Sequence, residues 1–150
     1  MNTSYETDVV AWANEQAALI RAGRFDQLDL THIAEEIEDV GKSEQRELAS
    51  RMAVLLMHLI KWKYQPSRRS KSWQFTISTQ RKEVAYVLKE APSLQTKFSD
   101  VSWVDLVWAK AKGQAETETG LEVATFPDVC PWAMADVLTE GWLPEQEIPS

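Results

Sequence analysis

Three polar side chains recur every seven residues along one stretch of the chain and could take part in acid–base chemistry. They are Glu44, Arg51 and His58. At about 100° per residue they share one predicted helix face with apolar side chains that belong in a core. A charged group in a core needs a polar partner. The pattern therefore allows two interpretations: a structural ladder, with His58 hydrogen-bonded beside Trp62 and Glu paired with Arg across a bundle, or a functional pocket.

An acidic cluster, "EEIED" at residues 35–39, raises the question of a metal site with His32 and His58. Di-metal sites in helical bundles use Glu-x-x-His on each of two helices, and this chain has no such motif. Glu36 also precedes His58 by about 33 Å if the helix between them is continuous. We therefore predict no metal and no cofactor, and interpret the cluster as a solvated first turn that complements the helix dipole. The alternative is a hydrolase-like or metal enzyme that uses Glu36 or Glu44 with His58.

A basic stretch, "KWKYQPSRRSKSW" at residues 61–73, contains five cations and no acid. The cations are Lys61, Lys63, Arg68, Arg69 and Lys71. Such side chains can hold phosphates while Trp73 or Tyr64 stacks on a base, which would make the stretch a nucleic-acid site. The structural alternative is that Lys61 and Lys63 favour the negative end of a helix dipole. Only Arg68, Arg69 and Lys71 then remain as free cations on a loop.

The rest of the chain is acidic. The formal charge of all 150 residues is −7, so the +5 of residues 61–73 leaves −12 for the remainder. An acidic body repels nucleic acid over most of its surface, so any such binding has to come from this one stretch.

The composition is that of one ordinary globular domain, with 44% hydrophobic and 26% charged residues. The opening "MNTSYETDVV" has no basic segment followed by an apolar run, so we expect no signal peptide. The apolar run at residues 54–57, which ends at His58, is too short to span a membrane. Cys130 is the single cysteine, so no intrachain disulfide can form and a cytoplasmic location is expected.

Proline and glycine divide the chain into helix-length segments without a hairpin signal, which predicts an all-α protein. We expect a single-domain bundle of four or five helices over residues 1–150. Gly23 should end the first helix, Asp29 should cap the second, Ser102 the fourth, and Pro131 should lie in the first turn of the last. The expected helices cover residues 7–22, 30–64, 73–90, 103–119 and 131–139.

The second helix positions Glu44, Arg51 and His58, so the length of this helix matters most. Ile33, Ile37 and Val40 keep the same phase as the apolar positions after residue 48. This phase does not slip at Gly41, which costs only ~1 kcal/mol in a helix interior. We therefore predict one long helix to about Tyr64. The alternative is a break at Gly41.

Five motifs in a fixed order give the chain a family resemblance: "EEIEDVG", "HLIKWKYQP", "APSL", "FPDVCPW" and "WLP". Over about residues 5–144 the chain resembles the bacterial family catalogued as domain of unknown function 29. The resemblance implies an all-α fold and a bacterial, cytoplasmic protein, and it implies no activity, because the family has none assigned. The matching positions singled out for testing are Glu35, Glu36, Glu38, His58, Lys61, Trp62, Pro66, Trp73 and Arg81.

The chain departs from the family along the fourth predicted helix. Family members tend to have Tyr and Arg where this chain has Trp108 and Lys112. A lysine cannot reproduce the two-pronged contact of an arginine. Any shared site that depends on such a contact is therefore in doubt here.

These observations favour a binding or regulatory module for another protein, or for a second copy of the chain, over an enzyme. Seven Trp exceed what a small core needs, and Trp is enriched at interfaces. We expect an exposed face that includes Trp103, Trp132 or Trp142, and no membrane partner. Two alternatives stay open: nucleic-acid binding through residues 61–73, and catalysis by Glu36, Glu44, Arg51 and His58.

Overall fold

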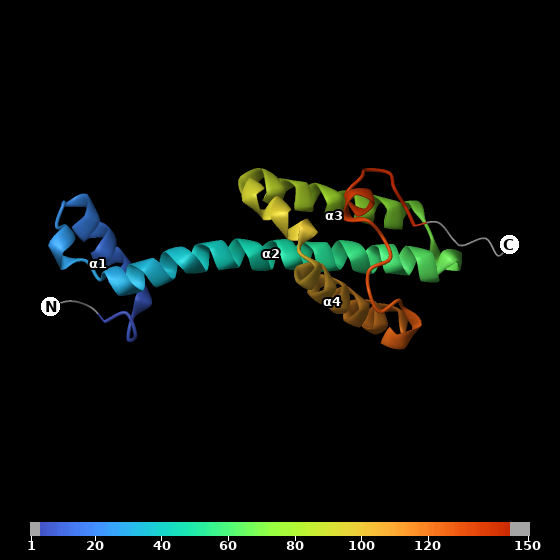
Figure 1. Cartoon of the computed structure of the whole chain (residues 1–150), viewed down its shortest axis with the longest axis horizontal. Coiled ribbons are helices and arrows are strands. Elements are labelled where there is room, and N and C mark those ends of the chain that lie inside the picture. Colours follow the sequence, from blue (N-terminus) through green and yellow to red (C-terminus); the bar gives the residue numbers. More distant parts are fainter. Residues whose placement is uncertain (1–3, 145–150) are drawn as a thin grey trace. The chain divides into compact units, whose positions relative to one another are not determined.

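The computed structural model describes residues 4–144, and every regular element within them is a helix (Figure 1). The prediction of an all-α fold is confirmed. The α-helices are α1 (Val9–Arg21), α2 (Leu30–Tyr64), α3 (Lys71–Glu90), α4 (Val101–Thr119) and α5 (Met134–Val137). The 3₁₀ helices between them are η1 (Phe25–Gln27), η2 (Pro66–Arg68), η3 (Pro92–Ser99) and η4 (Val123–Thr125).

The chain divides into two compact units, an N-terminal unit, Met1–Ser43, and a C-terminal unit, Glu44–Ser150. The expectation of a single domain over residues 1–150 stays a prediction. Over the residues that the structure describes, no helix combines the length and the apolar character that crossing a bilayer requires.

Helix α2 runs for 35 residues, so the prediction of one long helix is confirmed and the alternative break at Gly41 is wrong. Asp29 precedes its first residue, and the Asp29 Oδ1 accepts a hydrogen bond from the backbone N of His32 at 3.4 Å, as expected of an N-cap. The last turn contains Lys61 and Lys63, whose charges favour the negative end of the helix dipole.

Three helix starts differ from the prediction by two residues. Helix α1 begins at Val9 rather than residue 7, because the Asp8 carboxylate caps it by accepting from the backbone N–H of Ala11 at 3.0 Å. Helices α3 and α4 begin earlier than predicted. Helix α3 begins at Lys71 rather than residue 73, because the Ser70 hydroxyl caps it by accepting from the backbone N–H three residues later at 3.2 Å. Helix α4 is capped by Asp100 rather than Ser102, and the Asp100 carboxylate accepts an equivalent bond at 3.2 Å. These corrections have one cause: several residues in a short polar stretch can cap a helix, and tertiary packing decides among them.

Helix α5 is much shorter than the predicted segment of residues 131–139, and Pro131 lies outside it. The indole ring of Trp132 packs edge-on against Trp108, with centroids 5.5 Å apart, and against Trp142 at 5.9 Å. The backbone of Ala133 is extended, with φ −67° and ψ 138°. The ring packing thus keeps the chain extended where the proline signal predicted a helix start.

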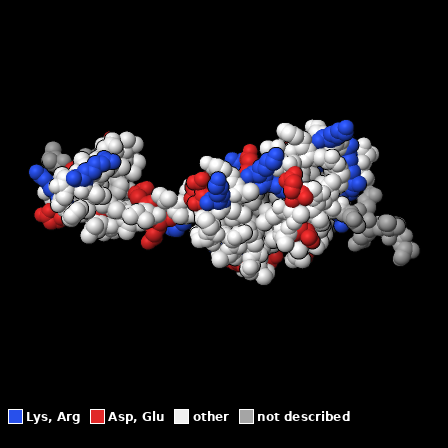
Figure 2. Space-filling view, turned by 90° about the horizontal axis from the view of Figure 1, so that it is seen from above, with Lys and Arg blue, Asp and Glu red and all other residues white. Residues whose placement is uncertain are grey.

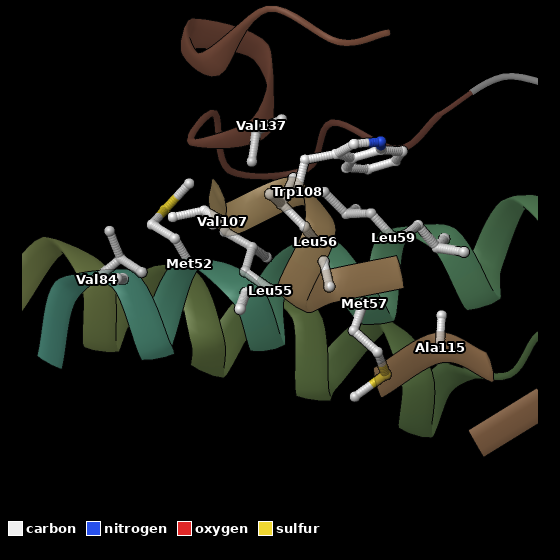
Figure 3. Close-up of a cluster of buried hydrophobic side chains, with 14 of the residues drawn as sticks. Met52, Leu55, Leu56, Met57, Leu59, Val84, Val107, Trp108, Ala115 and Val137 are labelled. Carbon is white, nitrogen blue, oxygen red and sulfur yellow. The ribbon is translucent and has the colours of Figure 1, made fainter. Parts of the chain in front are cut away.

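The C-terminal unit has an apolar core formed by α2, α3 and α4. In Figure 1, α3 and α4 flank the C-terminal part of α2, and the segment after α4 passes across α2 to reach α3. The close-up in Figure 3 shows Leu55, Leu56 and Leu59 of α2 beside Trp108 of α4, with Val137 of α5 pointing into the same cluster. Each fully buried side chain of this kind contributes roughly 1.5–3 kcal/mol.

Candidate functional site

The three polar residues predicted to share the apolar face of α2 lie at the edge of this core. Glu44, Arg51 and His58 are all half-buried, whereas Leu48 and Leu55 on the same face are fully buried. Because α2 is continuous, Glu44 lies about 21 Å and Glu36 about 33 Å from His58 along the helix axis. The structure therefore does not bring either candidate acid to His58.

Arg51 forms an ion pair across the bundle. Its Nη1 donates a short charge-assisted hydrogen bond to Oε2 of Glu83 on α3, and its Nη2 lies 3.7 Å from Oε1 of Glu47. Both Arg51 and Glu83 keep access to water, which weakens such a pair. This contact is the Glu–Arg pair across the bundle that the structural interpretation expects, with Glu83 as the acid, whereas the hydrogen bond expected of His58 stays a prediction.

His58 has a pKa below its ordinary value. Burial lowers its pKa below the ordinary 6.5, the charge of Lys61 lowers it further, and Glu118 of α4 opposes both effects. His58 is therefore largely neutral at neutral pH. Among the described residues, no three His, Cys, Asp or Glu side chains are grouped so that they could hold a metal ion.

Two cations of the basic stretch are engaged within the protein. Lys61 Nζ lies 3.7 Å from Oε2 of Glu118 and 5.0 Å from the ring centroid of Trp73. Arg69 donates from Nε to the carbonyl of Trp62 at 2.7 Å, and its guanidinium lies 4.9 Å from the Trp62 ring. Arg69 thus satisfies a carbonyl in the last turn of α2, and the expectation that it is a free cation is wrong.

Of the other three cations, two are more accessible. Arg68 and Lys71 are exposed, and Lys63 is half-buried with its ammonium 5.7 Å from the Tyr64 ring. Trp73, the predicted stacking residue, is half-buried beneath Lys61. Nucleic-acid binding by this stretch stays a prediction, and Arg68 and Lys71 are its best-placed cations.

Two buried cations hold the C-terminal segment to the bundle. Arg81 of α3 donates from Nε to the carbonyl of Val137 at 2.8 Å and from Nη2 to the carbonyl of Trp142, and burial lowers its pKa. Lys112 of α4 donates from Nζ to the carbonyl of Asp128 at 3.2 Å. This one contact needs no arginine fork, so a lysine suffices at this position.

The three Trp residues of the predicted surface, Trp103, Trp132 and Trp142, are half-buried, so a Trp-bearing binding surface stays a prediction. Trp103 packs edge-on against Phe98, with ring centroids 5.5 Å apart. Trp132 lies between Trp108 and Trp142. Core and edge packing therefore account for the high Trp content.

The N-terminal unit contains a polar network that no sequence pattern predicts. The Asp29 Oδ2 accepts from Trp12 Nε1 at 3.0 Å and lies 2.7 Å from His32 Nδ1. The backbone N of Asp29 donates to Gln16 Oε1 at 2.8 Å. The Tyr5 ring stacks on His32, with centroids 4.2 Å apart and planes 14° from parallel. The spacing of Asp29 and His32 is visible in the sequence, but their partners come from other segments.

Hydrogen bonds in the N-terminal unit shift the pKa values of Tyr5, Asp29 and His32. The hydrogen bond from the Tyr5 hydroxyl to Glu36 Oε1, at 2.5 Å, raises the pKa of Tyr5 to about 12. The bond between Asp29 and His32 lowers the pKa of Asp29 and raises the pKa of His32. Glu36, a predicted catalytic acid, is thus paired with a phenol, and Asp29 and His32 form an ion pair over an extended pH range.

The N-terminal unit also exposes much apolar surface. Within its described residues it buries one large apolar side chain, Trp12. It exposes seven, which are Val9, Val10, Ile20, Phe25, Leu30, Ile37 and Val40. The apolar face of α2 is therefore covered from Leu48 onward but uncovered earlier, where Ile37 is 67% and Val40 66% exposed. We call Leu30, Ile33, Ile37 and Val40 the apolar seam.

Comparison with known proteins gives one family. The family model described as Domain of unknown function DUF29 matches residues 4–143, which includes the motifs that carry the resemblance except for the last residue of "WLP", Pro144. No curated protein and no solved structure matches the chain.

Proposed function

Because the chain belongs to the family Domain of unknown function DUF29, which has no assigned function, we propose a function from the surface of this protein itself. It is a protein-binding module, and its binding surface is the N-terminal unit. The observation that supports this proposal is the imbalance between one buried and seven exposed large apolar side chains within residues 4–43.

A unit of about 40 residues is at the size below which folded domains usually need a partner, a metal or a disulfide. Trp12 and the polar network of Asp29 supply few buried apolar contacts. Burying one exposed Leu, Ile, Val or Phe contributes roughly 1.5–3 kcal/mol, so a partner that covers several of the seven would stabilise both itself and the unit. Isolated exposed apolar residues are ordinary, but a contiguous group is typical of a binding surface. Leu30, Ile37 and Val40 lie on one face of α2 and form such a group.

The other two candidate functions have less support. Catalysis by a Glu and His58 lacks a close acid on α2, since Glu36 and Glu44 lie turns away along the same helix. Nucleic-acid binding loses Arg69 and Lys61 to intramolecular contacts.

Site-specific photocrosslinking in producing cells tests the proposal. A photoreactive phenylalanine at Phe25 or Ile37 is expected to crosslink to one defined protein species, identified by mass spectrometry as another chain or a second copy. The matched control is the same probe at Ala109, an exposed position on α4. An additional Val40→Asp substitution should remove the Ile37 crosslink, whereas Val40→Thr should retain it. Equal background crosslinking at Ile37 and Ala109 would overturn the proposal.

We also propose that the protein is cytoplasmic and bacterial. The support for the location is the single cysteine, Cys130, which cannot form an intrachain disulfide. The support for a bacterial origin is the family resemblance. Fractionation of the producing bacterium tests the location, and recovery from the periplasm would contradict it.

A further inference from the structure

We infer that the apolar seam of α2 binds the exposed side of α3 on a second copy of this chain, so that copies associate head to tail. The inference rests on the proposed function, because it names the partner of the N-terminal unit. It follows from a second surface, on the C-terminal unit, whose chemistry complements that of the seam.

Helix α3 presents a basic and aromatic stripe. The stripe runs from Lys71 to Lys89, and its successive members are four, seven, four and three residues apart. This spacing keeps their side chains within about 60° of each other around the helix. Glu83 and Glu90, the acids of α3, lie outside this sector. We define the basic stripe as the exposed side chains Lys71, Phe75, Lys82, Tyr86 and Lys89. Figure 2 views the C-terminal unit from the α3 side and shows lysine and arginine side chains along it, with carboxylates interspersed.

A groove lies on each side of the stripe, one beside the first half of α3 and the other beside its second half. One, of about 490 Å³, is lined by Phe75, Ser78 and Gly141 among other residues. The other, of about 360 Å³, is lined by Thr79 and Tyr86 among others. A helix laid along the stripe can therefore place its side chains on both sides of the aromatic rings.

The charges of the two surfaces are opposite. The described part of the N-terminal unit has nine Asp or Glu and three Lys or Arg, a formal charge of −6. The stripe and the two grooves beside it together contain five Lys or Arg and three Glu, a formal charge of +2. The three glutamates are Glu47, Glu83 and Glu140. Pairing the seam with another seam would bring two units of charge −6 together, which like-charge repulsion disfavours. Pairing the seam with the stripe brings opposite charges together and speeds association.

The dimensions of the two surfaces also agree. Leu30 and Val40 are ten residues apart, about 15 Å along α2, and Phe75 and Tyr86 are eleven residues apart, about 16 Å along α3. The two aromatic rings can therefore reach both ends of the seam. The methylene stems of the lysines add apolar contact while the ammonium groups stay near the carboxylates.

Each copy carries one seam and one stripe, so the contact is heterologous and leaves one surface of each kind free in a dimer. This property allows a sharp test with two exposed-site variants, Ile37→Glu/Val40→Glu in the seam and Lys82→Glu/Lys89→Glu in the stripe. A Lys110→Glu variant on the exposed surface of α4 is the control. Far-UV circular dichroism verifies that all variants keep the helical content of the wild type.

Sedimentation velocity from micromolar to submillimolar concentration gives the readout. The weight-average mass of the wild type and of Lys110→Glu should rise to at least twice the monomer mass and fall back in high salt. Each double variant should stay monomeric alone. Mixed in equal amounts, the two should form a one-to-one complex, because the intact stripe of one binds the intact seam of the other.

Three results would overturn the inference. A wild type that is monomeric throughout shows that the partner is not a second copy. A stripe variant that associates like the wild type shows that the seam pairs with another seam. A mixture without a complex shows that the two surfaces do not bind each other. None of these results refutes the proposed function, which fails only if Ile37 gives no specific photocrosslink.

Discussion

Replacing Leu55 and Leu30 with alanine compares the covered and uncovered parts of one helix. Leu55 is 0% exposed and Leu30 is 67% exposed, although both lie on α2 and undergo the same chemical change. Leu55→Ala should lower the free energy of unfolding by about 2–5 kcal/mol, through lost burial and the cavity left behind. Leu30→Ala should change it by no more than about 0.5 kcal/mol. Alanine and leucine have similar helix propensities, so the helix itself does not account for the difference.

Urea unfolding followed by circular dichroism and Trp fluorescence measures both values. The protein concentration must be low enough for the wild type to be monomeric, since a second copy on the seam would protect Leu30. An intact helical spectrum of Leu30→Ala before unfolding is the control. If Leu30→Ala costs as much as Leu55→Ala in the monomer, the apolar seam is buried and the argument for a binding surface fails.

Three further predictions concern single contacts. The pKa of His32 is raised in the folded state, so its pair with Asp29 should stabilise the fold fully below about pH 6.5 and lose this effect as the pH rises through the folded pKa. Amide hydrogen exchange of α1 should then become faster. Unchanged exchange, or the same change in His32→Gln, would contradict this. Gly41→Ala should stabilise the protein by about 1 kcal/mol in thermal unfolding, because nothing lies within 4 Å of the added Cβ in a continuous helix; destabilisation would indicate a non-helical backbone. Arg81→Ala should cost about 1–3 kcal/mol by leaving the carbonyls of Val137 and Trp142 unpaired, with Arg81→Lys recovering only part; a lysine variant as stable as the wild type would refute a two-carbonyl contact.

The long helix could be predicted from the sequence because its signal is local. The apolar phase on both sides of Gly41 agrees, and Asp29 is a strong cap directly before the helix. Periodicity also places Leu48 and Leu55 correctly in the core. The same periodicity predicts that Ile37 and Val40 are also buried in the core, but both are exposed. A stripe of residues indicates which face of a helix is apolar, but whether anything covers that face depends on segments far away in the chain.

The partners of the candidate site residues were harder to predict from the sequence, because most of them come from distant segments of the chain. Arg51 pairs with Glu47 on its own helix, at a spacing that the sequence shows, but its closer acid is Glu83, 32 residues later on α3. Arg69 lies on what reads as a free loop, yet it folds back onto the carbonyl of Trp62. The stack of Tyr5 on His32 joins residues 27 positions apart, and no spacing rule predicts it.

The uneven distribution of buried apolar surface gives the two units different heat capacities of unfolding. Unfolding the C-terminal unit exposes the core of α2, α3 and α4, so its heat capacity rises and its stability falls on both warming and strong cooling. The N-terminal unit is held by Trp12 and by the hydrogen bonds of Asp29, and its unfolding exposes little new apolar surface. Its free energy of unfolding should therefore change almost linearly with temperature, and cold should weaken the C-terminal unit while sparing the N-terminal one.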